Sequence, residues 1–165
     1  MSSSVRPFTH RAKALVYSGH GPPPDVVRCV SLARPVSPPA PGTLSLRVLL
    51  APVNPSDINV IEGVYPHKPV VRAHDASDNT PLFVPGNEGL AQVVEVGEGV
   101  QGYETGDWVI MLASQMGTWA SAIDGVKPEE VLKVPRGQSG DGLPFLSEVN
   151  AATLTVSLRC PSKIV

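Results

Sequence analysis

A short polar cluster at the end of an apolar stretch carries the side chains best suited to chemistry. Residues 54–59 read Asn-Pro-Ser-Asp-Ile-Asn, they follow the apolar run 44–53, and Tyr65 comes shortly after them. A tyrosine phenol has an ordinary pKa of about 10, so it is protonated at neutral pH and can give its proton to a developing enolate. Tyr65 is therefore a candidate proton donor. From the residues alone, a packed aromatic ring with an exposed hydroxyl is the competing interpretation.

Composition places this cluster in one folded domain. The chain has 165 residues, of which 42% are hydrophobic and 17% are charged, and these values are typical of a globular chain with a core. The net charge of −2 gives no electrostatic case for nucleic acid or an anionic membrane as partner. No apolar run approaches the roughly 20 residues of a membrane-spanning helix. Cys29 and Cys160 form neither a metal-type spacing nor a disulfide framework, which predicts reduced thiols.

The elements expected to position the cluster are mainly strands. Glycine and proline are abundant, with 15 and 18 residues, and this favours short strands joined by turns. We expect one helical turn over 55–63, capped by Ser56 or Asp57, and a polar loop over 67–79. Apolar and β-branched runs predict strands at 13–17, 25–32, 44–53, 82–84, 90–96, 107–112, 117–123 and 131–134. The sequence therefore predicts a small, turn-rich β domain, most simply a partly closed barrel.

Four motifs in order carry a family resemblance. They are Asn-Pro-Ser-Asp at 54–57, Gly-Asn-Glu-Gly at 86–89, Val-Glu-Val-Gly at 94–97 and Gly-Asp-Trp-Val at 106–109. Together they resemble the catalytic domain of the medium-chain dehydrogenase/reductase superfamily. The resemblance implies a mainly β fold, a GroES-like partly open β-barrel with short helices. It divides the chain into an N-terminal tail (1–12), a GroES-like catalytic domain (13–156) and a tail that departs from the family (157–165).

The resemblance points to the zinc-free branch of that superfamily. Zinc-dependent members carry a cysteine where this chain has Asn54 and a histidine where it has Asn87. Structural and catalytic zinc sites use thiolate, imidazole or carboxylate ligands, and an amide is a poor substitute. The four-cysteine lobe that holds the structural zinc of those members has no counterpart here. The resemblance therefore implies that no metal is bound.

Within the zinc-free branch the chain is similar to the mitochondrial trans-2-enoyl thioester reductases. The added signals are Gly-x-Tyr at 63–65 and Gly-Thr-Trp at 117–119. The resemblance implies that NADPH delivers hydride to C3 of an enoyl-CoA or enoyl-acyl-carrier-protein thioester, and that Tyr65 protonates C2. It also implies a homodimer. The side chains expected to contact substrate or to support the site are Asn54, Asp57, Asn59, Asn87 and Trp119.

Several of these side chains have structural interpretations beside the functional ones. Asp57 and Asn59 suit capping of the local turn, and Glu88 suits a contact with backbone groups or an arginine. Trp119 fits an acyl pocket, a core or a domain interface equally well. Two other functions also remain open at this point. The first is a quinone or enone reductase of the same superfamily, and the second is a non-catalytic interaction isoform.

The cofactor half of such an enzyme is not recognisable in this chain. The family binds its nicotinamide on a Rossmann domain, whose Gly-rich turn opens a helix. Residues 97–102 match GxGxxG in letters only, since another strand and not a helix is expected after them. At Ser157 the family has an asparagine that contacts the cofactor. We therefore expect the Rossmann domain to be missing, 157–165 to be translated intron or an alternative last exon, and activity to be impaired.

The N-terminus has the composition of some targeting segments. Residues 1–24 contain Arg6, Arg11, Lys13 and four serines, and no acid precedes Asp25. Mitochondrial transit segments are rich in arginine and serine and poor in acids. With the family resemblance this predicts a mitochondrial matrix location, while a polar tail ahead of the first strand is the simpler alternative.

Overall fold

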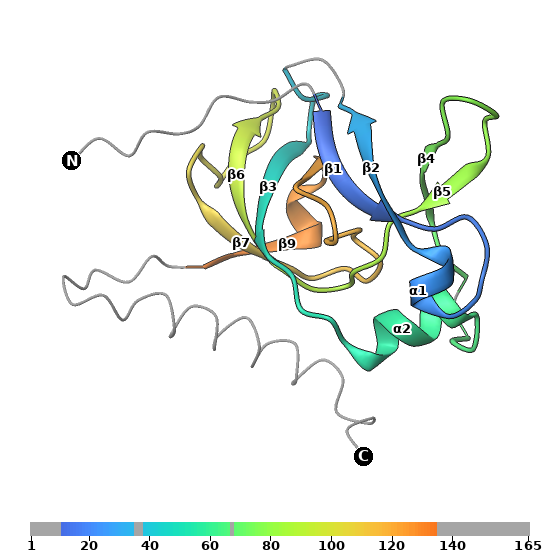
Figure 1. Cartoon of the computed structure of the whole chain (residues 1–165). Coiled ribbons are helices and arrows are strands. Elements are labelled where there is room, and N and C mark those ends of the chain that lie inside the picture. Colours follow the sequence, from blue (N-terminus) through green and yellow to red (C-terminus); the bar gives the residue numbers. More distant parts are fainter. Residues whose placement is uncertain (1–10, 35–37, 67, 135–165) are drawn as a thin grey trace.

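The computed structural model describes residues 11–34, 38–66 and 68–134, and the predictions for 1–10 and for 135–165, Ser157 included, lie outside them. Short strands dominate the described residues, as predicted (Figure 1). The elements are β1 (Arg11–Val16), α1 (Pro23–Val26), β2 (Arg28–Ala33), β3 (Leu44–Leu50), α2 (Pro55–Glu62), β4 (Val71–His74), β5 (Pro81–Phe83), β6 (Leu90–Val96), β7 (Trp108–Met111), β8 (Ala122–Val126), the 3-10 helix η1 (Pro128–Glu130) and β9 (Val131–Val134). Neither α-helix in the described residues is long and apolar enough to cross a membrane.

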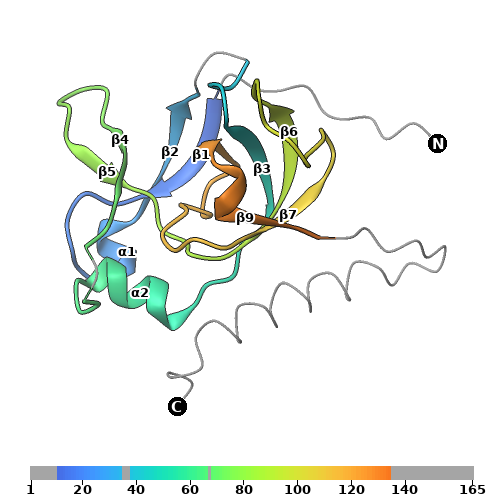
Figure 2. The ribbon, with the colours of Figure 1, turned by 180° about the vertical axis from the view of Figure 1, so that it is seen from behind.

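The main sheet is antiparallel and open. Its five strands lie in the order β8-β3-β6-β7-β9, and β1–β2 and β4–β5 form two separate antiparallel ribbons. A single bridge joins Ala14 of β1 to Ala120, and another joins Tyr17, which follows β1, to Phe83 of β5 and so links the two ribbons. Figures 1 and 2 show the strands curving together, with α1 and α2 at one end of the molecule. The prediction of a partly open barrel is confirmed.

The core lies between the curved strands. Leu44 and Leu46 of β3 are fully buried, as alternation along that strand predicts. They pack in a cluster with Ala91, Val93, Val109, Met111, Met116, Ile123, Val126 and Val131. The strand ends at Leu50, three residues before the predicted end, and a register shift precedes it. Val53 is consequently 68% exposed in the connection to α2.

The first ribbon confirms the predicted hairpin, but its second strand starts later than expected. β2 begins at Arg28 and not at Asp25, because residues 23–26 form the short helix α1. Proline fits the first turn of a helix, where its missing N–H has no partner to satisfy. The run Pro22–Pro24 therefore starts a helix inside the hairpin connection.

The second ribbon contradicts the prediction of a polar loop over 67–79. Within that segment β4 pairs with β5, with Val71 opposite Phe83 and His74 opposite Pro81. The residues of β4 are mostly exposed, so this segment is a solvent-facing strand and not a loop. Leu82 of β5 is buried against Ala14 and Val16, and this contact anchors the base of the ribbon.

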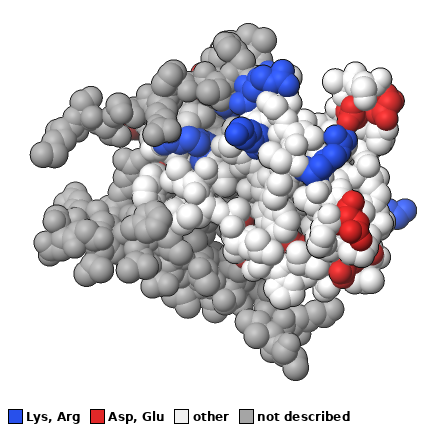
Figure 3. All heavy atoms as spheres, in the orientation of Figure 1, with Lys and Arg blue, Asp and Glu red and all other residues white. Residues whose placement is uncertain are grey.

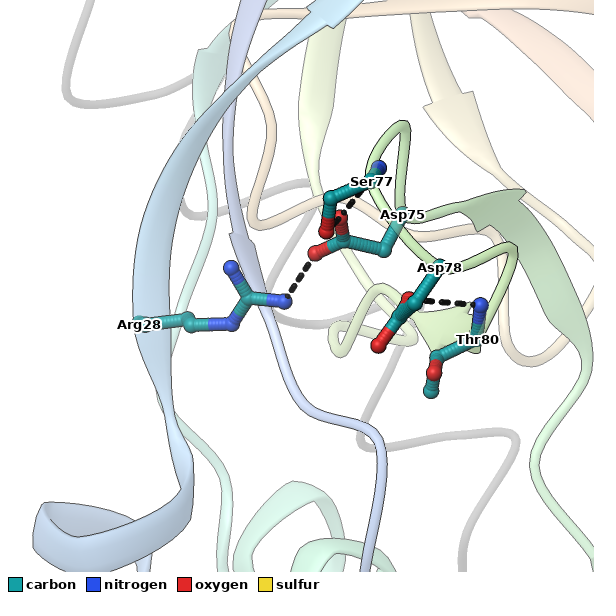
Figure 4. Close-up of polar contacts among 5 residues, drawn as sticks. All are labelled: Arg28, Asp75, Ser77, Asp78 and Thr80. Atoms are coloured by element: carbon teal, nitrogen blue, oxygen red, sulfur yellow. Dashed lines mark hydrogen bonds and ion pairs between the residues drawn. The ribbon is translucent and has the colours of Figure 1, made fainter.

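Polar contacts close the far end of the second ribbon (Figure 4). One carboxylate oxygen of Asp75 accepts hydrogen bonds from the Ser77 N–H and hydroxyl, at 2.9 and 2.7 Å. Asp78 accepts from the Thr80 N–H at 2.9 Å. Arg28 of β2 donates to the other Asp75 oxygen at 2.6 Å. The Ser77 and Arg28 hydrogen bonds hold the pKa of Asp75 well below its usual range.

On the face drawn in Figure 3, basic side chains gather over the first ribbon, beside the turn that carries Asp75 and Asp78.

Two of the remaining strands match their predicted bounds and two do not. β6 and β9 begin and end where expected, and β7 is shorter than the predicted run by one residue at each end. The predicted strand 117–123 is wrong over most of its length, since β8 starts only at Ala122. Gln115 and Gly117 have positive φ values of 57° and 76°, which interrupt an extended chain.

Candidate functional site

The polar cluster forms the start of α2. The N-cap residue is Asn54, Pro55 occupies the first turn, and Asp57 accepts the Asn54 backbone N–H at 3.0 Å. The predicted cap at Ser56 or Asp57 is therefore wrong in position, although Asp57 does serve the helix end. A carboxylate three residues after the cap satisfies a backbone donor that the helix leaves open.

Asp57 also joins this helix to the Gly-Asn-Glu-Gly segment. Its side chain is buried, and its second oxygen accepts the Asn87 amide nitrogen at 2.6 Å and the Asn87 backbone N–H at 3.2 Å. Burial raises the pKa of the Asp57 carboxyl, and the hydrogen bonds from Asn54 and Asn87 partly oppose that rise. Two segments that are 30 residues apart in sequence are thus fixed by one carboxylate.

Glu88 supports the same junction from the other side of Asn54. It accepts the Asn54 side-chain amide at 2.7 Å, so its partner is neither a backbone group nor an arginine. Burial raises the pKa of Glu88, and the charge of Asp57 raises it further. The Glu88 carbonyl accepts the Thr118 hydroxyl at 2.7 Å. The Gly-Thr-Trp segment therefore packs directly on the Gly-Asn-Glu-Gly segment.

Trp119 is hydrogen-bonded to the connection between β3 and α2. Its indole N–H donates to the Pro52 carbonyl at 3.0 Å, and its backbone N–H donates to Pro85 at 3.0 Å. The ring is half-buried. These contacts give Trp119 a local supporting role, and its role toward substrate stays a prediction.

Asn87 uses both ends of its amide. The nitrogen donates to Asp57, and the oxygen accepts the Gln115 backbone N–H at 2.7 Å. Asp57, Asn87 and Gln115 line one side of a small pocket, and Tyr17 lines another part of it. Tyr17 is almost fully buried, and burial raises its pKa to about 12. Sequence reasoning missed both Gln115 and Tyr17, since neither lies in a motif.

Tyr65 lies beyond the other end of α2. Its backbone N–H donates to the Asn59 carbonyl at 3.1 Å, and its side chain is half-buried. Asn59 contributes that carbonyl, while its own side chain is exposed. An eight-residue helix is about 12 Å long, so α2 separates Tyr65 from the Asp57–Asn87 junction. The structure thus joins Asn54, Asp57 and Asn87 and holds Tyr65 at the opposite helix end.

A glycine fixes the exit of the chain toward Tyr65. Gly63 ends α2 with φ of 78°, and a Cβ there would lie 2.8 Å from Cγ of His20. The His20 ring contacts the Ile61 carbonyl at 3.2 Å, and Gly21 donates its N–H to the same carbonyl at 3.2 Å. The loop before α1 therefore packs against the helix end that carries Tyr65.

The glycines of 97–102 lie in the connection between β6 and β7. Gly97 makes a tight contact with the preceding turn, because a Cβ there would lie 2.7 Å from the Thr43 carbonyl. The connection leads to β7 and not to a helix, as the sequence predicts. Among the described residues, no group of three or more His, Cys, Asp or Glu side chains is placed to hold a metal ion.

Replacing Asp57 with asparagine should destabilise the fold by about 1–3 kcal/mol. The two carboxylate oxygens accept hydrogen bonds from Asn54 and Asn87, and the NH₂ of an asparagine would face one of these donors without an acceptor. A folded-state pKa above the ordinary value means that wild-type stability falls as pH rises through that interval. The asparagine variant lacks this titration, so the advantage of the wild type should be largest at the acidic end. Urea unfolding of both proteins between roughly pH 4 and 7 measures it.

Glu88 titrates in both proteins, but the Asp57 charge that helps to raise its pKa is absent from the variant. Both changes make the advantage of the wild type shrink as pH rises, so the difference reports Asp57 together with its charge on Glu88. A difference in unfolding free energy that grows toward neutral pH would contradict this assignment.

The fold and the site together define a class of protein. An open five-stranded antiparallel sheet with two ribbons and a capped helix at one end is the GroES-like arrangement that the four motifs predict. Residues 40–136 match the family model of the alcohol dehydrogenase GroES-like domain, and the chain belongs to this family.

Two curated relatives indicate how the chain is placed within the family. The mitochondrial enoyl-[acyl-carrier-protein] reductase 2 of Debaryomyces hansenii is 36% identical over 88% of this chain and 38% of its own length. An NADPH quinone oxidoreductase of Kluyveromyces marxianus is 36% identical over 75% of this chain and 32% of its own length. The chain therefore spans well under half the length of both relatives.

Solved structures show the same similarity. The complex of Etr1p with NADP and crotonyl-CoA has a TM-score of 0.70 and 37% identity, over 86% of this chain and 36% of that one. The mitochondrial 2-enoyl thioester reductase Etr1p/Etr2p heterodimer of Candida tropicalis has a TM-score of 0.70 and 38% identity, over 76% of this chain and 34% of that one.

Proposed function

We propose that the protein reduces trans-2-enoyl thioesters of CoA or acyl carrier protein with NADPH, in mitochondrial fatty acid synthesis, with Tyr65 as the proton donor. The observation that carries the proposal is the likeness to Etr1p, whose complex holds NADP and crotonyl-CoA. The name of the D. hansenii relative supports both the reaction and the mitochondrial location. Because the chain spans only 38% of that relative, the proposal concerns the activity of the whole protein.

The chemistry assigned to this chain is the proton step. Reduction of a 2-enoyl thioester adds hydride at C3 and a proton at C2, and NADPH supplies the hydride. The Tyr65 O–H gives its proton to C2, and solvent returns a proton to the phenolate. We assign nicotinamide binding to a Rossmann domain beyond the GroES-like unit proposed for 13–156, because the matched family model is the GroES-like domain and the chain spans only 38% of the D. hansenii relative.

The Candida tropicalis heterodimer supports assembly of two such subunits, and we propose a dimer for this protein as well. We further propose that the N-terminal tail ends ahead of β1, which begins at Arg11 and not after residue 12. We also propose that 157–165 differs from the family and that the missing asparagine at Ser157 weakens nicotinamide binding.

A quinone reductase is the second candidate. The K. marxianus relative carries that activity in its name at the same 36% identity, so the identity values alone do not separate the two reactions. The presence of both Gly-Asn-Glu-Gly at 86–89 and Gly-Thr-Trp at 117–119 favours the enoyl reductase, because this pair of motifs resembles that family.

Steady-state NADPH oxidation by the purified protein, with crotonyl-CoA, hexenoyl-CoA and a quinone in parallel, tests the proposal. The expected result is a higher kcat/KM for the enoyl thioesters. A higher value for the quinone would support the second candidate instead. Turnover with neither substrate, together with binding to a longer enzyme of the family, would favour the non-catalytic interaction isoform.

A further inference from the structure

Gln115 contacts two segments that are distant from it in the sequence, one at Asn87 and one at 70–72. Its backbone N–H donates to the Asn87 side chain at 2.7 Å, and its side-chain oxygen accepts the Val70 N–H at 3.0 Å. Its carbonyl accepts the Arg72 guanidinium. Its φ of 57° is uncommon for a residue with a side chain and costs of order 1 kcal/mol or more, so the surrounding contacts must hold it there.

Gln115 is linked to the chain on both sides of Tyr65, indirectly through Asn87 on the N-terminal side and directly through Val70 on the C-terminal side. On the N-terminal side, Asn87 is bound to Asp57, which fixes the start of α2. On the C-terminal side, Val70 immediately precedes β4. Tyr65 lies between these two attachments, in the described residues 63–66 that follow α2. Gln115 thus connects the chain before Tyr65 with the chain after it, through Asn87 on one side and Val70 on the other.

We propose that Gln115 is a positioning residue for Tyr65. It does not need to touch substrate, because it acts by fixing the separation between α2 and Val70 and so the course of the segment between them. Freeing one end of a short connection returns conformational entropy to it and widens the range of phenol positions. A displacement of about 1 Å at a reacting group can cost on the order of 10²-fold in rate. This inference rests on the proposed role of Tyr65.

The matched pair Gln115→Ala and Gln115→Glu isolates the side-chain oxygen. Alanine removes the acceptor for the Val70 N–H and leaves the backbone contacts of residue 115, while glutamate keeps an oxygen at the same reach. Gln115→Ala should lower kcat for crotonyl-CoA by about 10- to 100-fold with a smaller change in KM. Gln115→Glu should restore kcat to within a few-fold of wild type.

Amide hydrogen exchange provides a readout that does not depend on turnover. In Gln115→Ala the N–H groups of Val70 and Tyr65 should lose about tenfold or more in protection. The Val93 N–H, which donates to Asp107 at 2.8 Å in the main sheet, should keep its protection and so reports that the variant is folded.

The two measurements separate this inference from the proposed function. Unchanged protection at Tyr65 in Gln115→Ala would overturn the positioning role, whatever the activity. Lost protection at Tyr65 with lowered kcat and rescue by glutamate supports it. Lost protection in a protein whose turnover does not need the Tyr65 phenol would uphold the positioning contact and reject the catalytic assignment of Tyr65.

Discussion

Replacing Tyr65 with phenylalanine is expected to lower kcat for enoyl thioester reduction by about 10²- to 10⁴-fold. The change removes only the hydroxyl, so the ring and the backbone hydrogen bond to Asn59 remain. Substrate binding should therefore change little, and the loss should appear in kcat and in kcat/KM alike. Steady-state kinetics with crotonyl-CoA and NADPH, with both concentrations varied, measures the two parameters.

Tyr103 provides the matched control for that experiment. Its hydroxyl donates to the carbonyls of Pro128 at 3.1 Å and Val131 at 3.0 Å, so it serves the junction of η1 and β9. Tyr103→Phe should cost about 1 kcal/mol of stability and leave kcat near the wild-type value. If Tyr65→Phe also kept a wild-type kcat, the proton would have to come from another group, and the assignment of Tyr65 would be wrong.

Replacing Gly86 with alanine is expected to cost about 3–5 kcal/mol in the free energy of unfolding. Gly86 has φ of 102°, and a Cβ there would lie 2.7 Å from Cδ1 of Trp119 and 2.8 Å from its backbone nitrogen. The Gly86 carbonyl accepts hydrogen bonds from the backbone N–H groups of Gly117 and Thr118, at 2.9 and 3.2 Å. The methyl group would therefore force apart the two segments that meet at Glu88 and Thr118. Urea unfolding measures the loss.

Gly99 separates backbone strain from the steric clash. Its φ is 80°, and nothing lies within 4 Å of the position a Cβ would take. Gly99→Ala should therefore cost only the positive-φ penalty of about 1 kcal/mol. Equal losses for the two variants would show that the close approach of Trp119 contributes nothing, against the expectation for Gly86.

The strands that a sequence can predict here are those that carry their own signal. β6 and β9 are β-branched runs bounded by turn residues, and both were located at their observed ends. β4 is a different case, because its four residues, Val-Arg-Ala-His, are largely exposed and only the pairing with β5 makes them a strand. Such a strand forms only because a distant segment pairs with it, so no local sequence pattern predicts it.

The same distinction holds for the site. The motifs single out Asn54, Asp57 and Asn87, and the structure places them in one hydrogen-bonded junction. The particular contact, one buried carboxylate between a helix start and a distant amide, depends on the path of the chain between them. Gln115 had no signal at all, because a left-handed backbone at a glutamine is imposed by its neighbours and not by its own preference.

The ribbon of β4 and β5 is held differently at its two ends. At its base, Leu82 is buried and the Tyr17 and Phe83 rings lie 5.3 Å apart, so apolar contact holds it. At its tip, the described contact to the rest of the molecule is the exposed ion pair of Arg28 with Asp75. Salt screens exposed ion pairs and leaves apolar burial largely intact. Rising ionic strength should thus weaken the contact at the tip while the base stays in place. The hairpin would then pivot as a unit about its buried base.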